Sequence, residues 1–238
     1  MADSGKPAPA YALVVAAHPD DAEYGVAGTV ALWSNEGCRT VYIVCTTGDK
    51  GSTDREVDAA WLKRTREREQ RAAARVVGVD EVVFLGYADQ ALQDTAALRK
   101  DIVRVIRRWR PRVVVGPDPF RRYLWHRDHR IAGQVVLDAV FPYASSLWSY
   151  PDLLDEGLDP HLVDEVWLWG SEQPDHFCDI GATFGHKLAA LHCHESQLKQ
   201  RPRDQFDEWL RQRYRAMAKG QDFEFAEAFR RLRVPRLG

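Results

Sequence analysis

Short apolar segments alternate with longer helical segments over residues 11–140, and this alternation restricts the possible fold more than any other feature of the sequence. The apolar segments are typical of strands buried on both faces, and they span 11–17, 40–47, 81–87 and 112–118. The segments that follow them predict helices over 22–36, 57–77, 94–110 and 128–140. Strand–helix–strand repeats form right-handed crossovers on a parallel sheet. The sequence therefore predicts an α/β fold with a mostly parallel sheet flanked by helices.

The second half of the chain is less regular. The segment VDEVWLWG at 163–170 predicts a fifth strand, and residues 181–200 and 204–231 are expected to be helical. Residues 1–10 are expected to form a flexible tail. A chain of 238 residues fits one large domain better than two. We therefore expect a single domain over 11–238.

The composition argues against several classes of function. The 33 basic and 35 acidic residues give a formal net charge of −2, so neither nucleic acid nor an anionic membrane is an expected partner. The sequence contains no run of about 18 apolar residues, the length needed to span a membrane. The first ten residues lack the apolar centre of a signal peptide. None of the four cysteines forms a C-x-x-C pair, which indicates reduced thiols and a cytoplasmic location.

Polar residues follow the first and the fourth expected strands. In a sheet of this kind these two strands are neighbours, and ligands bind beyond their carboxyl ends. The loop after the first strand is AHPDDAEYG at 17–25, and the loop after the fourth leads to HRDH at 126–129. We expect the side chains of both loops to meet there: His18, Asp20, Asp21, His126, Asp128 and His129.

Two imidazoles and one carboxylate are a typical ligand set for a catalytic zinc ion, with one position left for water. A second carboxylate can accept the proton of that water, so one of Asp20 and Asp21 could bind metal while the other acts as a base. Each residue also has an ordinary interpretation. Either aspartate could cap the following helix, His18 could pack in the core, and His126 and His129 could lie on a solvated helix face. The convergence of all of them on two loops favours the functional interpretation.

The segment AHPDDAEYGVAGT at 17–29, followed by HRDH, resembles the LmbE-like N-acetylglucosaminyl deacetylase family, also called the PIG-L superfamily. The pattern of that family is A-H-P-D-D-E/A-x-x-G-x-G-G-T, then H-x-D-H, and the resemblance extends to HESQ at 194–197. It implies a Rossmann-like sheet, a bound zinc ion and hydrolysis of N-acyl amides on amino sugars. Ala22 stands where many members have Glu, and Ala27 where many have Gly.

The resemblance also implies a role for each matching residue. Three residues would bind the zinc ion: His18, Asp21 and His129. Asp20 would be the general base. His126 would stabilise the oxyanion in its protonated form or protonate the leaving amine, and Asp128 would orient His126.

Two further residues are candidates for substrate binding. Arg66 matches a family position on a helix and would reach a substrate hydroxyl, although a charge pair on a solvated helix face explains it equally well. Asp89 follows the third strand and could line the crevice, although a turn residue is the simpler interpretation. His194 begins the HESQ stretch and is expected beside the site or at an interface. Similar proteins form trimers and hexamers, so the resemblance implies a homo-oligomer.

These observations predict a zinc-dependent amidohydrolase that removes an acetyl group from a small N-acetylglucosamine-type substrate. One alternative is a non-haem iron oxygenase, because two His and one carboxylate also bind iron in those enzymes. The α/β pattern disfavours it, since such oxygenases are usually β-barrels. The other alternative is a sugar- or nucleotide-binding protein that uses the crevice without catalysis.

Overall fold

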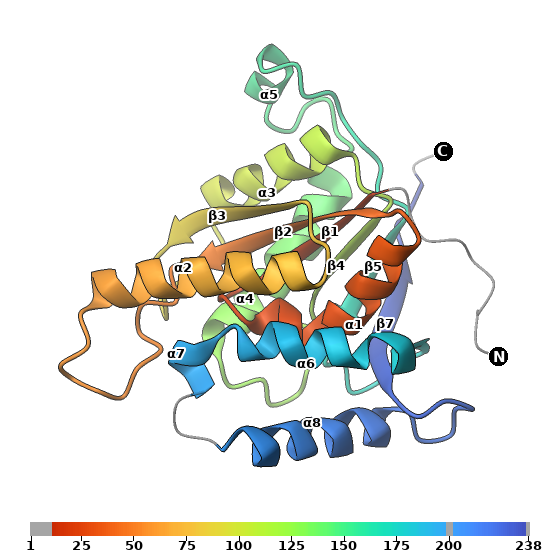
Figure 1. The fold of residues 1–238 in the computed structure, drawn as a ribbon. Helices are drawn as coiled ribbons and strands as arrows, with labels where there is room; N and C mark the ends of the chain where they lie inside the picture. The colour runs from red at the N-terminus through yellow and green to blue at the C-terminus, as the bar shows by residue number, and fades with distance from the viewer. Residues whose placement is uncertain (1–10, 199–201, 237–238) are drawn as a thin grey trace.

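The computed structural model describes residues 11–198 and 202–236 and contains one sheet of seven strands. The strands are β1 (Tyr11–Ala16), β2 (Arg39–Thr46), β3 (Glu81–Tyr87), β4 (Val113–Pro117), β5 (Glu165–Trp169), β6 (His176–Asp179) and β7 (Ala226–Arg233). Their order across the sheet is β3-β2-β1-β4-β5-β7-β6 (Figure 1). The first five strands are parallel, whereas β7 runs antiparallel to both β5 and β6. The mostly parallel α/β fold and the pairing of β1 with β4 are thus confirmed.

Helices cover both faces of the sheet (Figure 1). One face packs against α1 (Asp21–Asn35) and α2 (Ala59–Val76), and α6 (Phe184–His192) packs against these two helices. The other packs against α3 (Ala96–Trp109) and α4 (Arg127–Asp138). The remaining helices are α5 (Asp152–Asp155), α7 (Glu195–Leu198) and α8 (Arg203–Met217), and short 3-10 and π-helical segments occupy Gly181–Thr183 and Ala139–Tyr143.

The strand β1 shows why its sequence is continuously apolar. Leu13 and Val15 belong to the core beneath α3 and α4, whereas Val14 and Ala16 belong to the core beneath α1 and α2. Successive side chains of a strand point to opposite faces, so a strand covered on both sides must be apolar at every position. This central position fixes the end of β1, and hence the start of the 17–25 loop, at the middle of one sheet edge.

The C-terminal part of the chain corrects two expectations. The helix expected over 204–231 ends at Met217, and residues 226–233 form β7 instead. Ala, Glu and Arg favour a helix by propensity, but pairing of this segment with both β5 and β6 outweighs that preference. The helix expected over 181–200 is divided into a 3-10 turn, α6 and α7. Residues 199–201 lie outside the described residues.

The helix α8 adds an outer layer over α6 (Figure 1). Phe206, Leu210 and Tyr214 of α8 are buried against Phe184 and Leu191 of α6. Across residues 11–198 and 202–236, no helix has both the length and the apolar character needed to cross a membrane. The tail expected over 1–10 falls outside the described residues.

Candidate active site

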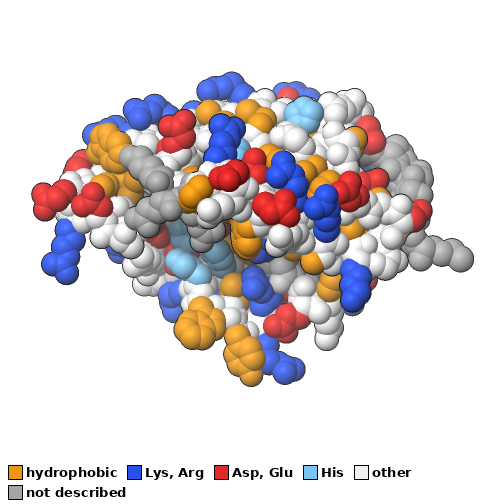
Figure 2. All heavy atoms as spheres, turned by 60° about the horizontal axis from the view of Figure 1, so that its bottom comes forward, with side chains coloured by type: hydrophobic (Ala, Val, Ile, Leu, Met, Phe, Trp, Pro, Cys, Tyr) orange, Lys and Arg blue, Asp and Glu red, His pale blue; other side chains and the backbone are white. Residues whose placement is uncertain are grey.

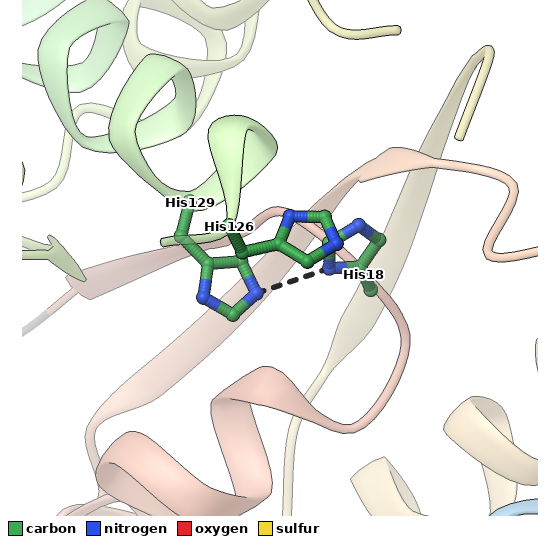
Figure 3. A group of neighbouring side chains, drawn as sticks. All are labelled: His18, His126 and His129. Atoms are coloured by element: carbon green, nitrogen blue, oxygen red, sulfur yellow. Dashed lines mark hydrogen bonds between the residues drawn. The ribbon is translucent and has the colours of Figure 1, made fainter. Parts of the chain in front are cut away.

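The two loops meet as the strand order requires. The Nδ1 atom of His18 lies 3.1 Å from Nε2 of His129, although the residues are 111 positions apart. The carboxylate of Asp21 lies 3.4 Å from His18 Nδ1 and 3.2 Å from His129 Nε2. The His126 ring is beside them, with its centroid 4.6 Å from that of His18 (Figure 3). All of the residues proposed as metal ligands are therefore in one place.

The separations of these ligand atoms fit a divalent metal. Zinc–nitrogen and zinc–oxygen bonds of roughly 2.0–2.2 Å at tetrahedral angles place two ligand atoms roughly 3.3 Å apart. The two imidazole nitrogens lie 3.1 Å apart, Asp21 Oδ2 lies 3.4 Å from His18 Nδ1, and the other oxygen, Oδ1, lies 3.2 Å from His129 Nε2, all close to that value. The rings of His18, His126 and His129 also bring three nitrogens within 4.8 Å of one another, so His126 is a further candidate metal ligand beside the set.

The second ring nitrogen of His18 faces two buried carboxylates. Nε2 lies 3.1 Å from Asp128 Oδ2 and 3.2 Å from Asp89 Oδ1. A carboxylate on one nitrogen holds the proton there and leaves the other nitrogen free to bind a metal. Asp128 is itself fixed, because its carboxylate accepts hydrogen bonds from the backbone N–H groups of Gln90 and Leu92 at 2.7 and 3.1 Å. The carboxylate of Asp128 is therefore a partner of His18, and Asp128 contacts the ring of His126 through its backbone N–H alone.

His126 is the N-cap residue of α4, so 126–129 does straddle the junction of a loop and a helix. Its Nδ1 accepts a hydrogen bond from the backbone N–H of Asp128 at 3.2 Å. Burial and the nearby positive charges of His18 and His129 lower the pKa of His126. The lowered pKa favours the neutral ring, in which the proton is on Nε2, and the role expected of protonated His126 stays a prediction. A neutral ring still provides one N–H donor.

Asp20 has an unusual backbone. Its φ of 93° and ψ of −24° place a non-glycine residue in the left-handed region, at a cost of about 1–3 kcal/mol that is typical of functional sites. It occupies the N-cap position of α1, yet its side chain makes no capping hydrogen bond within the described chain. The carboxylate instead pairs with Arg66 at 3.2 Å. The capping interpretation therefore does not explain this residue.

The charges of the site favour a cation. Burial raises the pKa of Asp20 to about 6, although the nearby Arg66 opposes the shift. Burial would likewise raise the pKa of Asp21, but His129 and His18 hold it well below its usual range. Burial lowers the pKa of His18, but hydrogen bonds and charge from Asp21 and Asp89 outweigh this and raise it to about 10. The metal-free site thus holds a proton on His18, where several carboxylates attract positive charge.

The two residues expected to bind substrate are buried. Arg66 is 4% exposed, and its terminal nitrogens donate to the backbone carbonyls of Pro19 and Gly48 as well as to Asp20. Asp89 is 3% exposed and contacts His18. Both side chains therefore hold the loops of the site in place, and a contact of either with a substrate stays a prediction.

The surface above the site is hollowed. Figure 2 shows histidine side chains in a hollow, with hydrophobic and basic side chains at its edge. The loop between β4 and His126 contributes three exposed aromatic residues, Phe120, Tyr123 and Trp125. Two of the histidines of the site are accessible, since His126 is exposed and the His129 side chain is 28% exposed. A small molecule can therefore reach the imidazoles of His126 and His129.

Two buried polar residues beside Asp20 were not identified from the sequence. Gln70 and Glu23 are both completely buried. The backbone N–H of Asp20 donates to Gln70 at 2.9 Å, and Gln70 donates to Glu23 at 2.8 Å. Glu23 also accepts from His194 at 3.2 Å. The position of Glu23 within the AHPDDAE motif could have indicated a role in the site. Gln70 lies in a highly charged helix, and nothing in the sequence pattern there predicts that its side chain is buried.

Sequence comparisons match the chain to a family and to characterised relatives. The family model for GlcNAc-PI de-N-acetylase, PIG-L, matches residues 13–140. The diacetylchitobiose deacetylase of Thermococcus kodakarensis is 36% identical over 197 residues, which cover 83% of this chain and 72% of the relative. The 1D-myo-inositol 2-acetamido-2-deoxy-alpha-D-glucopyranoside deacetylase of Mycobacteroides abscessus is 30% identical over 226 residues, covering 78% of this chain and 81% of the relative.

Structural comparisons agree. The N,N'-diacetylchitobiose deacetylase of Pyrococcus horikoshii, solved with its inhibitor MPG, has a TM-score of 0.88 and 28% identity, covering 94% of this chain and 84% of that one. The 4-carboxy-2-hydroxymuconate hydratase GalB of Pseudomonas putida shares the fold at a TM-score of 0.78 and 22% identity, covering 96% of this chain and 98% of that one. The match of more than half the chain to the family model, together with these relatives, shows that this chain belongs to the PIG-L family of deacetylases.

Proposed function

We propose that this protein is a zinc-dependent hydrolase that removes the acetyl group from an N-acetylglucosamine-type small molecule. The observation that supports this most directly is the convergence of His18, Asp21 and His129 around one point, with Asp20 directly before Asp21 in the sequence. The relatives support the substrate class, since they are deacetylases of diacetylchitobiose and of an acetamido-glucopyranoside.

Each group has a defined task in the proposed reaction. A metal held by His18, Asp21 and His129 would polarise the amide carbonyl and activate a water molecule. Asp20 accepts the proton of the attacking water and passes a proton to the departing nitrogen. His126 donates its Nε2–H to the carbonyl oxygen as that oxygen gains negative charge. Water adds to the carbonyl carbon and the C–N bond breaks, so the products are acetate and a free amine.

Asp128 and Asp89 orient His18, because both contact the ring nitrogen that is not proposed to bind the metal. Both accept from the second nitrogen of His18 and keep Nδ1 directed at His129 and Asp21. A carboxylate behind a metal-binding histidine typically strengthens metal affinity by 10–100-fold. Neither carboxylate is needed at the reacting atoms in this proposal.

The fold alone does not choose the reaction, because a hydratase shares it. The proposed activity is tested by measuring amine release from a panel of N-acetylated amino sugars, with the protein loaded with zinc. The panel includes N-acetylglucosamine, diacetylchitobiose and an N-acetylglucosaminyl inositol. We expect release from at least one member, and little or none from the same protein carrying Asp20→Asn.

Two further measurements, oxygen consumption and sugar binding, separate this function from the alternatives. Oxygen consumption by an iron-loaded sample, without amine release, would indicate an oxygenase. Tight sugar binding without turnover of any panel member, and with no effect of Asp20→Asn, would indicate a binding protein. Either result would contradict the proposed deacetylase activity.

A further inference from the structure

A chain of buried polar side chains leads from the far side of α1 to the backbone of Asp20. Its members come from three separate elements: Glu23 from α1, Gln70 from α2 and His194 from the connection between α6 and α7. Glu23 and Gln70 have no exposed surface and His194 has 1%. Buried polar groups are costly unless each finds a partner. The contacts between these three residues are therefore a specific feature and not an accident of packing.

The hydrogen bonds of this chain have a fixed direction. His194 Nε2 lies 3.2 Å from Glu23 Oε2, and Gln70 Nε2 donates to Glu23 Oε1 at 2.8 Å. An ionised carboxylate only accepts hydrogen bonds, so Glu23 forces the amide of Gln70 to present its nitrogen to it. The oxygen of that amide then faces the opposite way, where it accepts from the backbone N–H of Asp20 at 2.9 Å.

Asp20 needs this support because of its conformation. It holds the left-handed backbone angles that a non-glycine residue adopts only when its surroundings impose them. Arg66, one helical turn before Gln70 on α2, donates to the Asp20 carboxylate at 3.2 Å. The helix α2 thus contacts Asp20 at two points, the backbone through Gln70 and the side chain through Arg66.

We propose that Glu23, Gln70 and His194 are positioning residues that hold Asp20 in its left-handed conformation, directed at the reacting water. This inference rests on the proposed function, in which Asp20 is the base. The side-chain hydrogen bonds described for these three residues join them to one another and to the backbone of Asp20, and the proposed role requires no contact with the substrate or the metal ligands. Their effect is transmitted through the orientation of one side-chain amide.

Two variants of the Glu23–Gln70 pair separate positioning from packing. Gln70→Leu keeps most of the buried volume and removes the acceptor of the Asp20 N–H. The exchange Glu23→Gln with Gln70→Glu keeps every hydrogen bond: the new carboxylate at 70 accepts from Asp20 and from the amide at 23, whose oxygen accepts from His194. A packing role predicts that the apolar variant is tolerated better than the exchange, and a positioning role predicts the reverse.

The measurements are kcat, KM, bound zinc and the hydrogen exchange rate of the Asp20 amide by NMR. We expect Gln70→Leu to lower kcat by about 10–100-fold, the effect of a misplaced reacting group. KM and zinc content should stay within twofold, and the Asp20 amide should exchange at least about tenfold faster as its hydrogen bond is lost. The exchange variant should recover most of kcat and of the amide protection.

A matched control is available on α8. Gln212 donates to Glu208 at 3.1 Å, so this exposed pair has the same chemistry as Gln70 and Glu23. Gln212→Leu should leave kcat and the Asp20 amide unchanged. If Gln70→Leu fails to fold, His194→Leu is compared with His194→Gln instead. Of these two variants, only His194→Gln retains a hydrogen-bond donor for the carboxylate of Glu23.

The outcomes distinguish a failure of the positioning role from a failure of the proposed deacetylase function. Unchanged kcat and unchanged amide protection in Gln70→Leu, or loss of both in the exchange variant, would overturn the inference. If the protein shows no deacetylase activity, or Asp20→Asn keeps full turnover, the proposed function fails, while the exchange rate of the Asp20 amide still decides whether the three residues hold this backbone.

Discussion

His18 Nδ1 and His129 Nε2 face each other at 3.1 Å, from loops that follow two neighbouring strands. Two imidazole nitrogens at this distance need a proton or a cation between them, because two lone pairs directed at each other repel. Asp21 lies within 3.4 Å of both nitrogens and stabilises either positive charge. A divalent metal ion, as proposed, would satisfy all three side chains at once.

Replacing either histidine should therefore abolish metal binding. We expect about one zinc ion per chain in the unaltered protein and less than a tenth of that in His18→Ala or His129→Ala, because a site with two ligands binds zinc weakly. The metal content is measured by mass spectrometry after dialysis. His186→Ala, which alters an exposed histidine of α6, is the control. Stoichiometric zinc in His18→Ala would mean that the ligands are other residues.

Asp20→Asn should separate catalysis from metal binding. Asparagine keeps the shape of the side chain but cannot accept the proton of water, so we expect kcat to fall by about 10²–10⁴-fold. Zinc content should not change, because the proposed ligands are His18, Asp21 and His129. Nearly normal turnover in a fully zinc-loaded Asp20→Asn protein would exclude Asp20 as the base.

The pH dependence of turnover should reflect the environment of Asp20. Its pKa is raised to about 6 in the metal-free site, and a bound cation lowers it. A base must be ionised, so activity should decrease as pH falls through the pKa that applies in the loaded enzyme. Arg66 lowers that pKa, so Arg66→Met should move the acidic limb of kcat/KM to higher pH. Arg68→Met, which alters the contact of Arg68 with Thr65, is the control, and an unmoved limb in zinc-loaded Arg66→Met would contradict the assignment.

The gathering of these residues was largely predictable because they lie in, or at the end of, the loops that follow two apolar strands whose order follows from the βαβ rule. The directions in which individual side chains point were not predictable from the sequence. The backbone N–H of Asp128 contacts His126, but the carboxylate of Asp128 is held by the N–H groups of Gln90 and Leu92 and so faces His18. Gln90 and Leu92 lie in the loop after β3, so the spacing of residues within HRDH cannot predict that they bind the Asp128 carboxylate. The sequence predicts a helix where β7 lies for a similar reason, since the pairing partners of β7 are distant in sequence.

Replacements of His126 should show that a neutral donor suffices at this position. Its Nδ1 accepts from the N–H of Asp128, so its Nε2–H is the group available to an oxyanion. His126→Gln retains an N–H donor of similar reach and should keep more turnover than His126→Ala, for which we expect a loss of about 10²–10³-fold in kcat. Both should bind zinc. Equal activity of the two variants would remove the donor role from His126.

A buried ion pair should make the missed strand β7 essential for stability. Lys187 of α6 and Glu227 of β7 are 2.6 Å apart and neither has exposed side-chain surface. Lys187 also donates to the backbone carbonyls of Glu23 and Tyr24, while Glu227 accepts from the N–H groups of Gly28 and Thr29. Burial lowers the pKa of Lys187, but the charge of Glu227 outweighs this and raises it, so the lysine is charged in the folded state.

Lys187→Met should therefore leave an unpaired buried carboxylate and lower the free energy of unfolding by about 3–5 kcal/mol. Lys63→Met is the control, because Lys63 and Glu67 form a partly exposed i,i+4 pair on α2 whose loss should cost only about 0.3–0.5 kcal/mol. Urea denaturation of both variants measures the difference. A loss below about 1 kcal/mol in Lys187→Met would show that Glu227 takes up a proton or finds another partner, and that the pair does not join β7 to α6.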